Sequence, residues 1–450
     1  MTKSSYIWVA APDLSWHTSE RIARGGGPAP RQTLRYATLT AMGTQANDAQ
    51  PQRRPPHRRE MILHAAVDAF THGGYYGTTM ADIATAVGIS ATALYRHFRN
   101  KQQLLGQCLL VGLDDTLNRL DAAYRTDDSG DTVLAELVRV ALELRGLPRL
   151  WQLEFRNLTA ADKTAVLVRA ARITRYLRHT IGMRRPELSG ADVELLSWCV
   201  LSIAVSPSYH RAELPAPVAA QVLDAAVAAV ITTEMPEHPA GPAPNRPPRA
   251  ETGNTALDRA LRSERMLAEA ARLFSTRGYA AVGIEDIGAA VGVTGPALYH
   301  HFSSKAELLD QIVRRQDEWL RLLLARAIAE GRSAEESMRS LMRSFAQLGV
   351  DEPDLLAITV SETRHLPGDA VQRYRRVRLD GIAQWARMLQ AVRPDLPAPA
   401  ARVLSRAVTT VVIDAVRNPR FRRRGDLVDV LVAIGERIET AGIPGRVSAP

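Results

Sequence analysis

The chain has 450 residues, of which 46% are hydrophobic and 23% are charged, and its formal net charge at pH 7 is +9. This length predicts two or more domains, and the apolar content is ample for buried cores, which excludes a small disulfide-stapled scaffold. Cys108 and Cys199 lie far apart inside helical patterns, so we interpret them as buried reduced thiols rather than a disulfide or a metal site. No stretch approaches transmembrane length, so we expect a cytoplasmic protein without a membrane partner.

Two segments lack hydrophobic periodicity. Residues 1–56 mix Gly, Pro, Gln, Ser and Arg and predict a disordered basic tail, in which Met42 is an alternative start of the protein. Residues 236–256 are rich in proline and predict a linker between two domains. At about 3.1 Å per residue such a linker reaches about 60 Å, which is enough to pass from one folded unit to the far end of another.

The chain contains an internal repeat. Two stretches that start near Arg58 and Arg262 align without a gap at a spacing of about 204 residues, and roughly 20 of about 50 positions are identical. A shorter match follows later in each half, where EFRNL (154–158) parallels ETRHL (362–366). The spacing therefore indicates a duplication of whole units rather than a short-period solenoid.

Each copy of the repeat predicts three short helices with a tight turn between the second and the third. In the first copy Ile83 and Val87 share one helical face, and Gly88 follows where a left-handed residue is needed. Ser90 can then cap the next helix. A helix-turn-helix of this kind presents its last helix to the DNA major groove. The second copy repeats the pattern with Ile284, Ile287, Val291, Gly292, Thr294 as the cap and Pro296 in the first turn.

These residues resemble the DNA-binding domain of TetR/AcrR-type transcriptional regulators. The resemblance implies an all-α fold in which each unit has a three-helix DNA-binding head and a larger helical body for ligand binding and dimerisation. It covers heads at 57–105 and 257–309 and bodies at 106–235 and 310–441, with a tail at 442–450. The motif residues of the first copy are Phe70, Gly74, Asp82, Ile83, Gly88, Leu94, Tyr95, His97, Phe98, Lys101 and Leu104.

The position of each residue on the helix-turn-helix predicts its contact with DNA. The start of the last helix meets base edges, while flanking hydroxyl, amide and cationic groups contact phosphates. Arg96 is the long donor in the first copy that can bond guanine with two hydrogen bonds. Arg53, Arg54, Arg58 and Arg59 before the first helix either contact phosphates or stay solvated. The predicted groove residues are Ser90, Ala91, Thr92 and Arg96, and the predicted backbone contacts are Thr79, Tyr95, His97 and Lys101.

The second copy departs from the first at several of these positions. Many family members carry a lysine after the capping residue, but Ala91 and Gly295 stand there in this chain. Gly283 replaces Thr79 and removes a hydroxyl, and the groove residues also differ between the copies. We therefore expect unlike half-sites and a second head that binds mainly the DNA backbone. Packing in the head is the alternative for Tyr95 and its equivalent, while Phe98 and Phe302 are predicted core residues. The second set is Thr294, Gly295, Pro296 and His300 for the groove, and Tyr299, His301 and Lys305 for the backbone.

Aromatic and arginine side chains of the bodies are candidates for lining an effector cavity, with core packing as the competing interpretation. We expect a hydrophobic or amphipathic small molecule, whose acidic group would pair with Arg156 or Arg364. A metal site at His300 and His301 is disfavoured, because adjacent helical side chains point about 100° apart. The candidates are Trp151, Phe155, Arg156, Tyr176 and Trp198 in the first body, and Phe345, Arg364, Tyr374 and Trp385 in the second.

The resemblance implies a ligand-responsive regulator, and in particular a repressor. Such a protein binds double-stranded operator DNA and switches between two states. Apolar stripes in helices at about 191–206, 215–233, 398–416 and 425–441 predict that the two units pair within one chain as a pseudo-dimer on an asymmetric operator. A homodimer of whole chains stays open. The competing hypothesis is a ligand-binding or adaptor protein whose heads no longer bind DNA. No enzyme activity and no cofactor are expected, since no nucleophile–base, metal or phosphate-loop pattern occurs.

Overall fold

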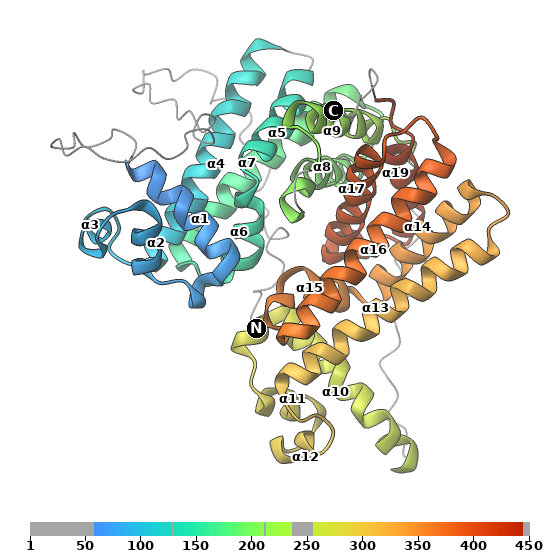
Figure 1. Ribbon diagram of the computed structural model, residues 1–450. Coiled ribbons are helices and arrows are strands. Elements are labelled where there is room, and N and C mark those ends of the chain that lie inside the picture. Colours follow the sequence, from blue (N-terminus) through green and yellow to red (C-terminus); the bar gives the residue numbers. More distant parts are fainter. Residues whose placement is uncertain (1–57, 128–129, 211–212, 236–254, 444–450) are drawn as a thin grey trace.

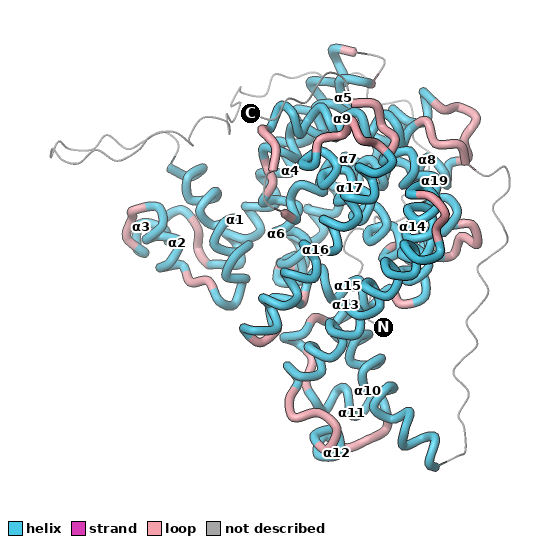
Figure 2. Tube along the Cα trace, turned by 45° about the vertical axis from the view of Figure 1, so that its right-hand side comes forward, coloured by secondary structure: helices cyan, strands magenta, loops and turns pink. Residues whose placement is uncertain are grey.

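The computed structural model describes residues 58–127, 130–210, 213–235 and 255–443, so the predicted tail at 1–56 lies outside the described residues. Every regular element within those ranges is a helix, and none of them is a strand (Figure 2). The all-α prediction is confirmed. Two units follow one another along the chain, coloured blue to green and yellow to red in Figure 1.

The first unit begins with a three-helix head and continues into a helical body. The head consists of α1 (Arg58–Gly77), α2 (Met80–Val87) and α3 (Ala91–His97). The body consists of α4 (Lys101–Thr126), α5 (Asp131–Glu143), α6 (Gly146–Glu154), η1 (Phe155–Asn157), α7 (Ala160–Arg184), α8 (Gly190–Val205), η2 (Ser206–Tyr209) and α9 (Ala216–Ile231).

The second unit repeats this order. Its head consists of α10 (Thr255–Arg277), η3 (Tyr279–Ala281), α11 (Ile284–Val291) and α12 (Gly295–Tyr299), so α10 already begins two residues inside the predicted linker. Its body consists of α13 (Lys305–Glu330), α14 (Ala334–Asp351), α15 (Pro353–Ser361), η4 (Thr363–His365), α16 (Gly368–Val392), α17 (Ala398–Arg417), α18 (Pro419–Arg422) and α19 (Leu427–Glu439).

Caps and left-handed glycines set the boundaries of these helices. Gly88 and Gly292 end α2 and α11 with φ of 70° and 71°, as the turn of a helix-turn-helix requires. The Ser304 hydroxyl accepts a hydrogen bond from the backbone N–H of Glu307 at 3.1 Å and so caps α13. The carboxylate of Glu307 accepts from the N–H of Ser303 instead of from Ser304, so one half of the capping box is displaced by one residue.

Head and body are joined by one continuous helix in each unit. The expected boundaries at 105/106 and 309/310 fall inside α4 and α13, each of which is 26 residues long. A rotation of either head therefore carries the start of this long helix with it.

The bodies meet through four helices, α8 and α9 of the first unit and α17 and α19 of the second (Figure 1). Their apolar side chains, among them Val200, Val227, Val408 and Ile434, belong to one buried cluster. The segment Gly190–Tyr209 is long and apolar enough to cross a membrane by length and composition, which corrects the expectation that no stretch approaches this length. In the structure 72% of that segment is buried, because α8 is the central helix of the contact between the units.

Candidate nucleic-acid interface

The first recognition helix is capped and held by two buried side chains. The Ser90 hydroxyl accepts a hydrogen bond from the backbone N–H of Ala93 at 3.2 Å. Leu94 and Phe98, which are 0% and 1% exposed, anchor α3 to the head. Of the predicted groove residues, Ser90, Thr92 and Arg96 are exposed and Ala91 is half-buried.

The two tyrosines predicted to contact DNA lie on the surface. Tyr95 is 52% exposed and Tyr299 is 53% exposed, so the alternative of core packing is wrong for both. Phe98 and Phe302 are buried, as predicted. His97 is exposed beside Tyr95 at the end of α3.

Thr79 begins the second helix of the first head and has a structural contact. Its hydroxyl accepts from the N–H of Asp82 at 3.1 Å and donates to the carboxylate of Asp82 at 2.7 Å. The same carboxylate accepts from the N–H of Thr79 at 2.8 Å. These hydrogen bonds, the hydroxyl's first, lower the pKa of Asp82. Thr79 is therefore both the cap of α2 and an exposed hydroxyl on the predicted DNA side.

The two lysines predicted for the DNA backbone bind the heads themselves. Lys101 Nζ donates to the carbonyl oxygens of Tyr75 at 2.6 Å and Thr78 at 2.8 Å, and it lies 4.4 Å from the centre of the Tyr75 ring. Lys305 Nζ makes the same bonds to Tyr279 at 3.0 Å and Val282 at 2.8 Å. Since an ammonium has three donors, one remains on each lysine. The sequence motif missed this role because it shows spacing but no hydrogen-bond partner.

The second head has a weaker recognition helix. In α12 Thr294 occupies the capping position, but its side chain makes no capping hydrogen bond. Pro296 has no N–H and so removes one of the donors that such a cap would bind, which corrects the expectation that Thr294 caps the helix. α12 has only five residues, and His300 and His301 follow it on the surface. Gly283 leaves α11 without a hydroxyl cap, although the Asp286 carboxylate accepts from the Gly283 N–H at 2.8 Å.

A buried glutamate joins the first head to the opposite unit. Glu154 is 0% exposed and accepts from the backbone N–H of Tyr75 at 3.2 Å, where α1 ends. It forms an ion pair with Arg364 of the second unit. Gly74, with φ of 72°, makes room for that guanidinium, because a Cβ there would lie 3.0 Å from Arg364 Nη1. We call Glu154, Tyr75 and Arg364 the first clamp.

The second clamp repeats this arrangement with the units exchanged. Glu362, also 0% exposed, accepts from the N–H of Tyr279 at 3.0 Å and pairs with Arg156 of the first unit. Burial opposes ionisation of Glu362, but the Arg156 charge and these hydrogen bonds lower its pKa. Gly278, with φ of 85°, admits the Arg156 guanidinium. Each head is thus tied to the body of the other unit.

One residue differs between the clamps. Asn157 donates to Glu154 at 2.6 Å in the first clamp. At the equivalent place in the second clamp, His365 stacks on the Tyr279 ring with centroids 4.9 Å apart. Burial and then the neighbouring Arg364 charge lower the pKa of His365.

None of the candidate ligand residues lines either of the two pockets that the structure shows in its described part. Arg156 and Arg364 are paired with buried glutamates, which corrects the expectation that they bind an acidic ligand group. The other seven make contacts within the folded chain. Five of them are in ring contacts, which are Trp151 with Phe155, Phe345 with Trp385, and Trp198 with Phe421. The hydroxyls of Tyr176 and Tyr374 donate hydrogen bonds to the Asp121 carboxylate and to the Thr359 carbonyl, respectively.

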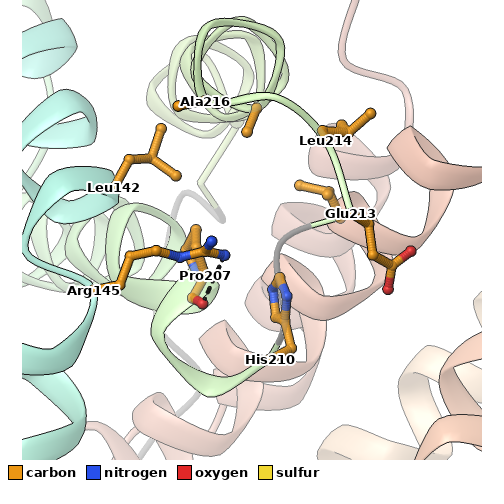
Figure 3. Close-up of a pocket in the computed structure, with 9 residues that line it drawn as sticks. Leu142, Arg145, Pro207, His210, Glu213, Leu214 and Ala216 are labelled. Carbon is orange, nitrogen blue, oxygen red and sulfur yellow. Dashed lines mark hydrogen bonds between the residues drawn. The ribbon is translucent and has the colours of Figure 1, made fainter. Parts of the chain in front are cut away.

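Two pockets occur elsewhere, and neither is lined by any of those nine residues. The first has about 430 Å³ of empty space beside η2 and α9. In Figure 3 Arg145 points to the Pro207 carbonyl, to which it donates at 3.1 Å, and Leu142 and Leu214 supply apolar walls. The second, of about 1000 Å³, lies where Thr233 and Glu234 of the first unit approach α14, α16 and α19. No group of three metal-binding side chains occurs within the described ranges.

Comparisons with known proteins agree with the geometry of the heads. Residues 62–108 and 266–312 each match the family described as bacterial regulatory proteins, tetR family. The chain is 41% identical over 73 residues to the regulator TtgR of Pseudomonas putida, which covers 16% of this chain and 34% of that protein. It is 30% identical over 105 residues to the repressor KstR2 of Rhodococcus jostii, which covers 23% of this chain and 52% of that protein. The matched segments thus span between about a third and about half of these relatives.

Solved structures are similar to about two fifths of the chain. PfmR of Thermus thermophilus, a TetR-family regulator, is 23% identical, with a TM-score of 0.34 over 39% of this chain and 96% of that chain. AmtR of Mycobacterium smegmatis is 25% identical, with a TM-score of 0.34 over 42% of this chain and 92% of that chain. The relatives are named as transcriptional regulators, in agreement with the prediction that the chain is not an enzyme. The two matches, one in each head, show that both heads are similar to this family of bacterial regulatory proteins and that the similarity occurs twice along the chain.

Proposed function

We propose that the chain is a DNA-binding transcriptional regulator that acts in the cytoplasm as a repressor. The observation that carries this proposal is the surface of α3, where a capped helix exposes Thr92, Tyr95 and Arg96 together. A short exposed helix with a bidentate donor fits the major groove, and an exposed phenol beside that donor fits a phosphate.

The two units form a covalent pseudo-dimer in this proposal, and the operator is asymmetric. The four-helix contact of α8, α9, α17 and α19 supports pairing within one chain. The heads differ at Arg96 against His300 and at Thr92 against Pro296, so each half-site would be read by different donors. The second head would bind mainly phosphates, since α12 has the shorter and uncapped helix.

A small-molecule effector would change the relative position of the heads. The clamps support this, because a movement in one body pulls on the head of the other unit through Glu154–Arg364 or Glu362–Arg156. The effector would bind one arrangement of the units more tightly than the other. The resulting change in DNA affinity is limited by the difference between the effector's affinities for the two arrangements.

The competing function is an adaptor whose heads no longer bind DNA. It is favoured by the second head alone, in which Gly283 and Pro296 remove capping interactions. The first head keeps both caps, so we assign this role at most to the second head.

Gel-shift titration of the region upstream of the gene tests the proposal. The intact chain should bind it with a steep salt dependence, and Arg96→Ala should weaken binding by about 1 to 3 kcal/mol at one base pair. Arg326→Ala is the matched control, because Arg326 is an exposed arginine near the far end of α13. Equal binding of the upstream region and unrelated DNA, unchanged by Arg96→Ala, would contradict the assignment.

A further inference from the structure

The same backbone arrangement occurs in both units near the contact between them. Arg185 Nη1 donates to the carbonyls of Ile231 at 2.5 Å and Thr233 at 3.2 Å. Arg393 Nη1 donates to the carbonyls of Glu439 at 2.7 Å and Ala441 at 2.9 Å. Equivalent residues in this region are therefore separated by a constant 208 positions in the sequence, as α8 and α17 also begin at residues 190 and 398. For any contact between the units, this register identifies the equivalent residue of the other unit. It therefore predicts which residues would meet if two identical units paired.

The first informative contact is ionic. Glu213 of the first unit forms ion pairs with Arg402 and Arg406 on α17 of the second unit. The Arg406 side chain is only 10% exposed, so the pair is partly removed from water. The residues of α8 equivalent to these arginines are Glu194 and Trp198. Two first units paired with each other would place the Glu213 carboxylate against a carboxylate and an indole.

The second contact runs in the opposite direction along the interface. Arg424 Nη1 of the second unit lies 2.7 Å from Asp192 Oδ1 of the first, and the two side chains are 13% and 15% exposed. The equivalent of Asp192 in the second unit is Ala400. Two second units paired with each other would therefore leave Arg424 with its own unit's Asp426, 2.9 Å from Arg424 Nη2, but without the carboxylate across the contact.

The third contact is aromatic. Trp198 on α8 packs against Phe421 on α18, with ring centroids 6.4 Å apart and an angle of 75° between the planes. Phe421 is 4% exposed. Arg406 is the equivalent of Trp198 in the second unit. A pair of second units would therefore place the Arg406 guanidinium against Phe421. In that pair Arg406 would also lose its ion pair with Glu213.

We propose that these three contacts form a recognition code by which the first unit pairs with a second unit and rejects a copy of itself. The repeated backbone register lets the three pairings be compared residue by residue, and the side chains satisfy one of them. The Glu213 and Asp192 carboxylates meet arginines in the mixed pair, and the aromatic rings meet each other. Like charges or unpaired partly buried charges penalise both identical pairings. Every assembly of this chain then contains pairs of unlike heads. The importance of this asymmetry for DNA binding rests on the proposed function.

Native mass spectrometry of the cleaved full-length chain tests the code without DNA. A protease site is placed within residues 236–254 of the intact protein, which is folded, cleaved and incubated so that the fragments can exchange. We expect complexes of one first and one second unit, at least about 100-fold more abundant than either identical pair, because each tenfold needs only about 1.4 kcal/mol. Identical pairs in the random proportion would overturn the proposal.

Charge exchange separates recognition from general stability. Glu213→Arg should reduce the mixed complex at least about tenfold. Glu213→Arg with Arg402→Glu and Arg406→Glu should restore it. Arg343→Glu is the control, because Arg343 pairs with Asp429 inside the second unit. Far-ultraviolet circular dichroism identifies variants that fail to fold. A folded Glu213→Arg variant that pairs normally would overturn the code, whereas absence of DNA binding by the intact chain would affect only the proposed function.

Discussion

The two units share one fold, but their heads are attached differently. In the first unit the apolar core runs without interruption from Phe70 in the head through Leu113 and Leu117 of α4 to the contact between the units. In the second unit the core of the head forms a separate cluster with α15 and the start of α16. A repeated backbone therefore does not by itself repeat the coupling between a head and its body.

The cause lies in one turn of the long helix that joins head and body. At the positions of Gly112 and Leu113 in α4, α13 carries Gln316 and Asp317, which are 4% and 6% exposed. No hydrogen-bond donor lies in reach of Asp317 Oδ2 within the part of the chain that the structure describes. This polar layer interrupts the apolar core, so the second head should open locally at a lower free energy than the first.

Breaking the clamps should give the largest effect and the clearest contrast. Arg364→Met leaves Glu154 buried without its cation and should lower the free energy of unfolding by about 2 to 4 kcal/mol, after allowance for the partly exposed arginine. Arg156→Met does the same to Glu362, but its effect should concentrate in the second head, whose core is separate. Urea unfolding with hydrogen exchange measures both. Uniform loss of protection in both variants would contradict the difference between the heads.

The same contrast should appear on DNA. Arg96→Ala should cost about 1 to 3 kcal/mol and relax the preference at one base pair, whereas His300→Ala should weaken binding less and without a change of preference. Tyr95→Ala should weaken binding to all sequences and leave the dependence on salt unchanged, since the phenol is a proposed phosphate contact that carries no charge. Competition gel shifts with single-base operator variants measure this. If His300→Ala changed base preference more than Arg96→Ala, the roles of the heads would be reversed.

Removing the polar layer should make the second head resemble the first. Burial raises the pKa of Asp317 from 3.8 to about 6, so this group favours the folded state while protonated, and its contribution is lost as pH rises from about 4 to about 6. Asp317→Leu, the residue of the first unit, should stabilise the second head by about 1 to 2 kcal/mol at pH 7 and remove this pH dependence.

Hydrogen exchange at pH 5 and pH 7 measures the effect on the second head. Asp380→Leu is the control, because Asp380 is an exposed carboxylate on α16. A destabilised Asp317→Leu variant would mean that the layer is satisfied by interactions other than those described above.

The smallest effect concerns the missing cap. Gly283→Thr places a hydroxyl where Thr79 stands in the first head, and the backbone already has the extended conformation of a cap. Because glycine is itself a fair capping residue, the gain should be only a few tenths of a kcal/mol. Thr79→Gly should lower the free energy of unfolding by a similar amount. Thermal unfolding of the two variants therefore measures the contribution of one hydroxyl cap from both directions. A loss of stability in Gly283→Thr would instead point to crowding by Glu285, whose Oε2 lies 3.0 Å from the added Cβ.

The sequence alone determined the helical fold, the two heads and the capped third helix of the first head. Caps, left-handed glycines and helical periodicity act over three or four residues, so Ser90, Gly88 and the stripe of Ile83 and Val87 could be read directly. The four helices of the contact between units were also visible as apolar stripes. Their boundaries differ from the prediction by one or two residues at most ends.

Only the tertiary structure decided how the remaining polar groups are used. Arg156 and Arg364 looked available for a ligand, but their partners, Glu362 and Glu154, lie more than 200 residues away in the sequence. Lys101 was assigned to DNA because a motif does not show the carbonyls of Tyr75 and Thr78. Charged and aromatic side chains act through the groups that folding brings near them. Local sequence determines backbone preferences, but it does not show which residues distant in the chain become contact partners.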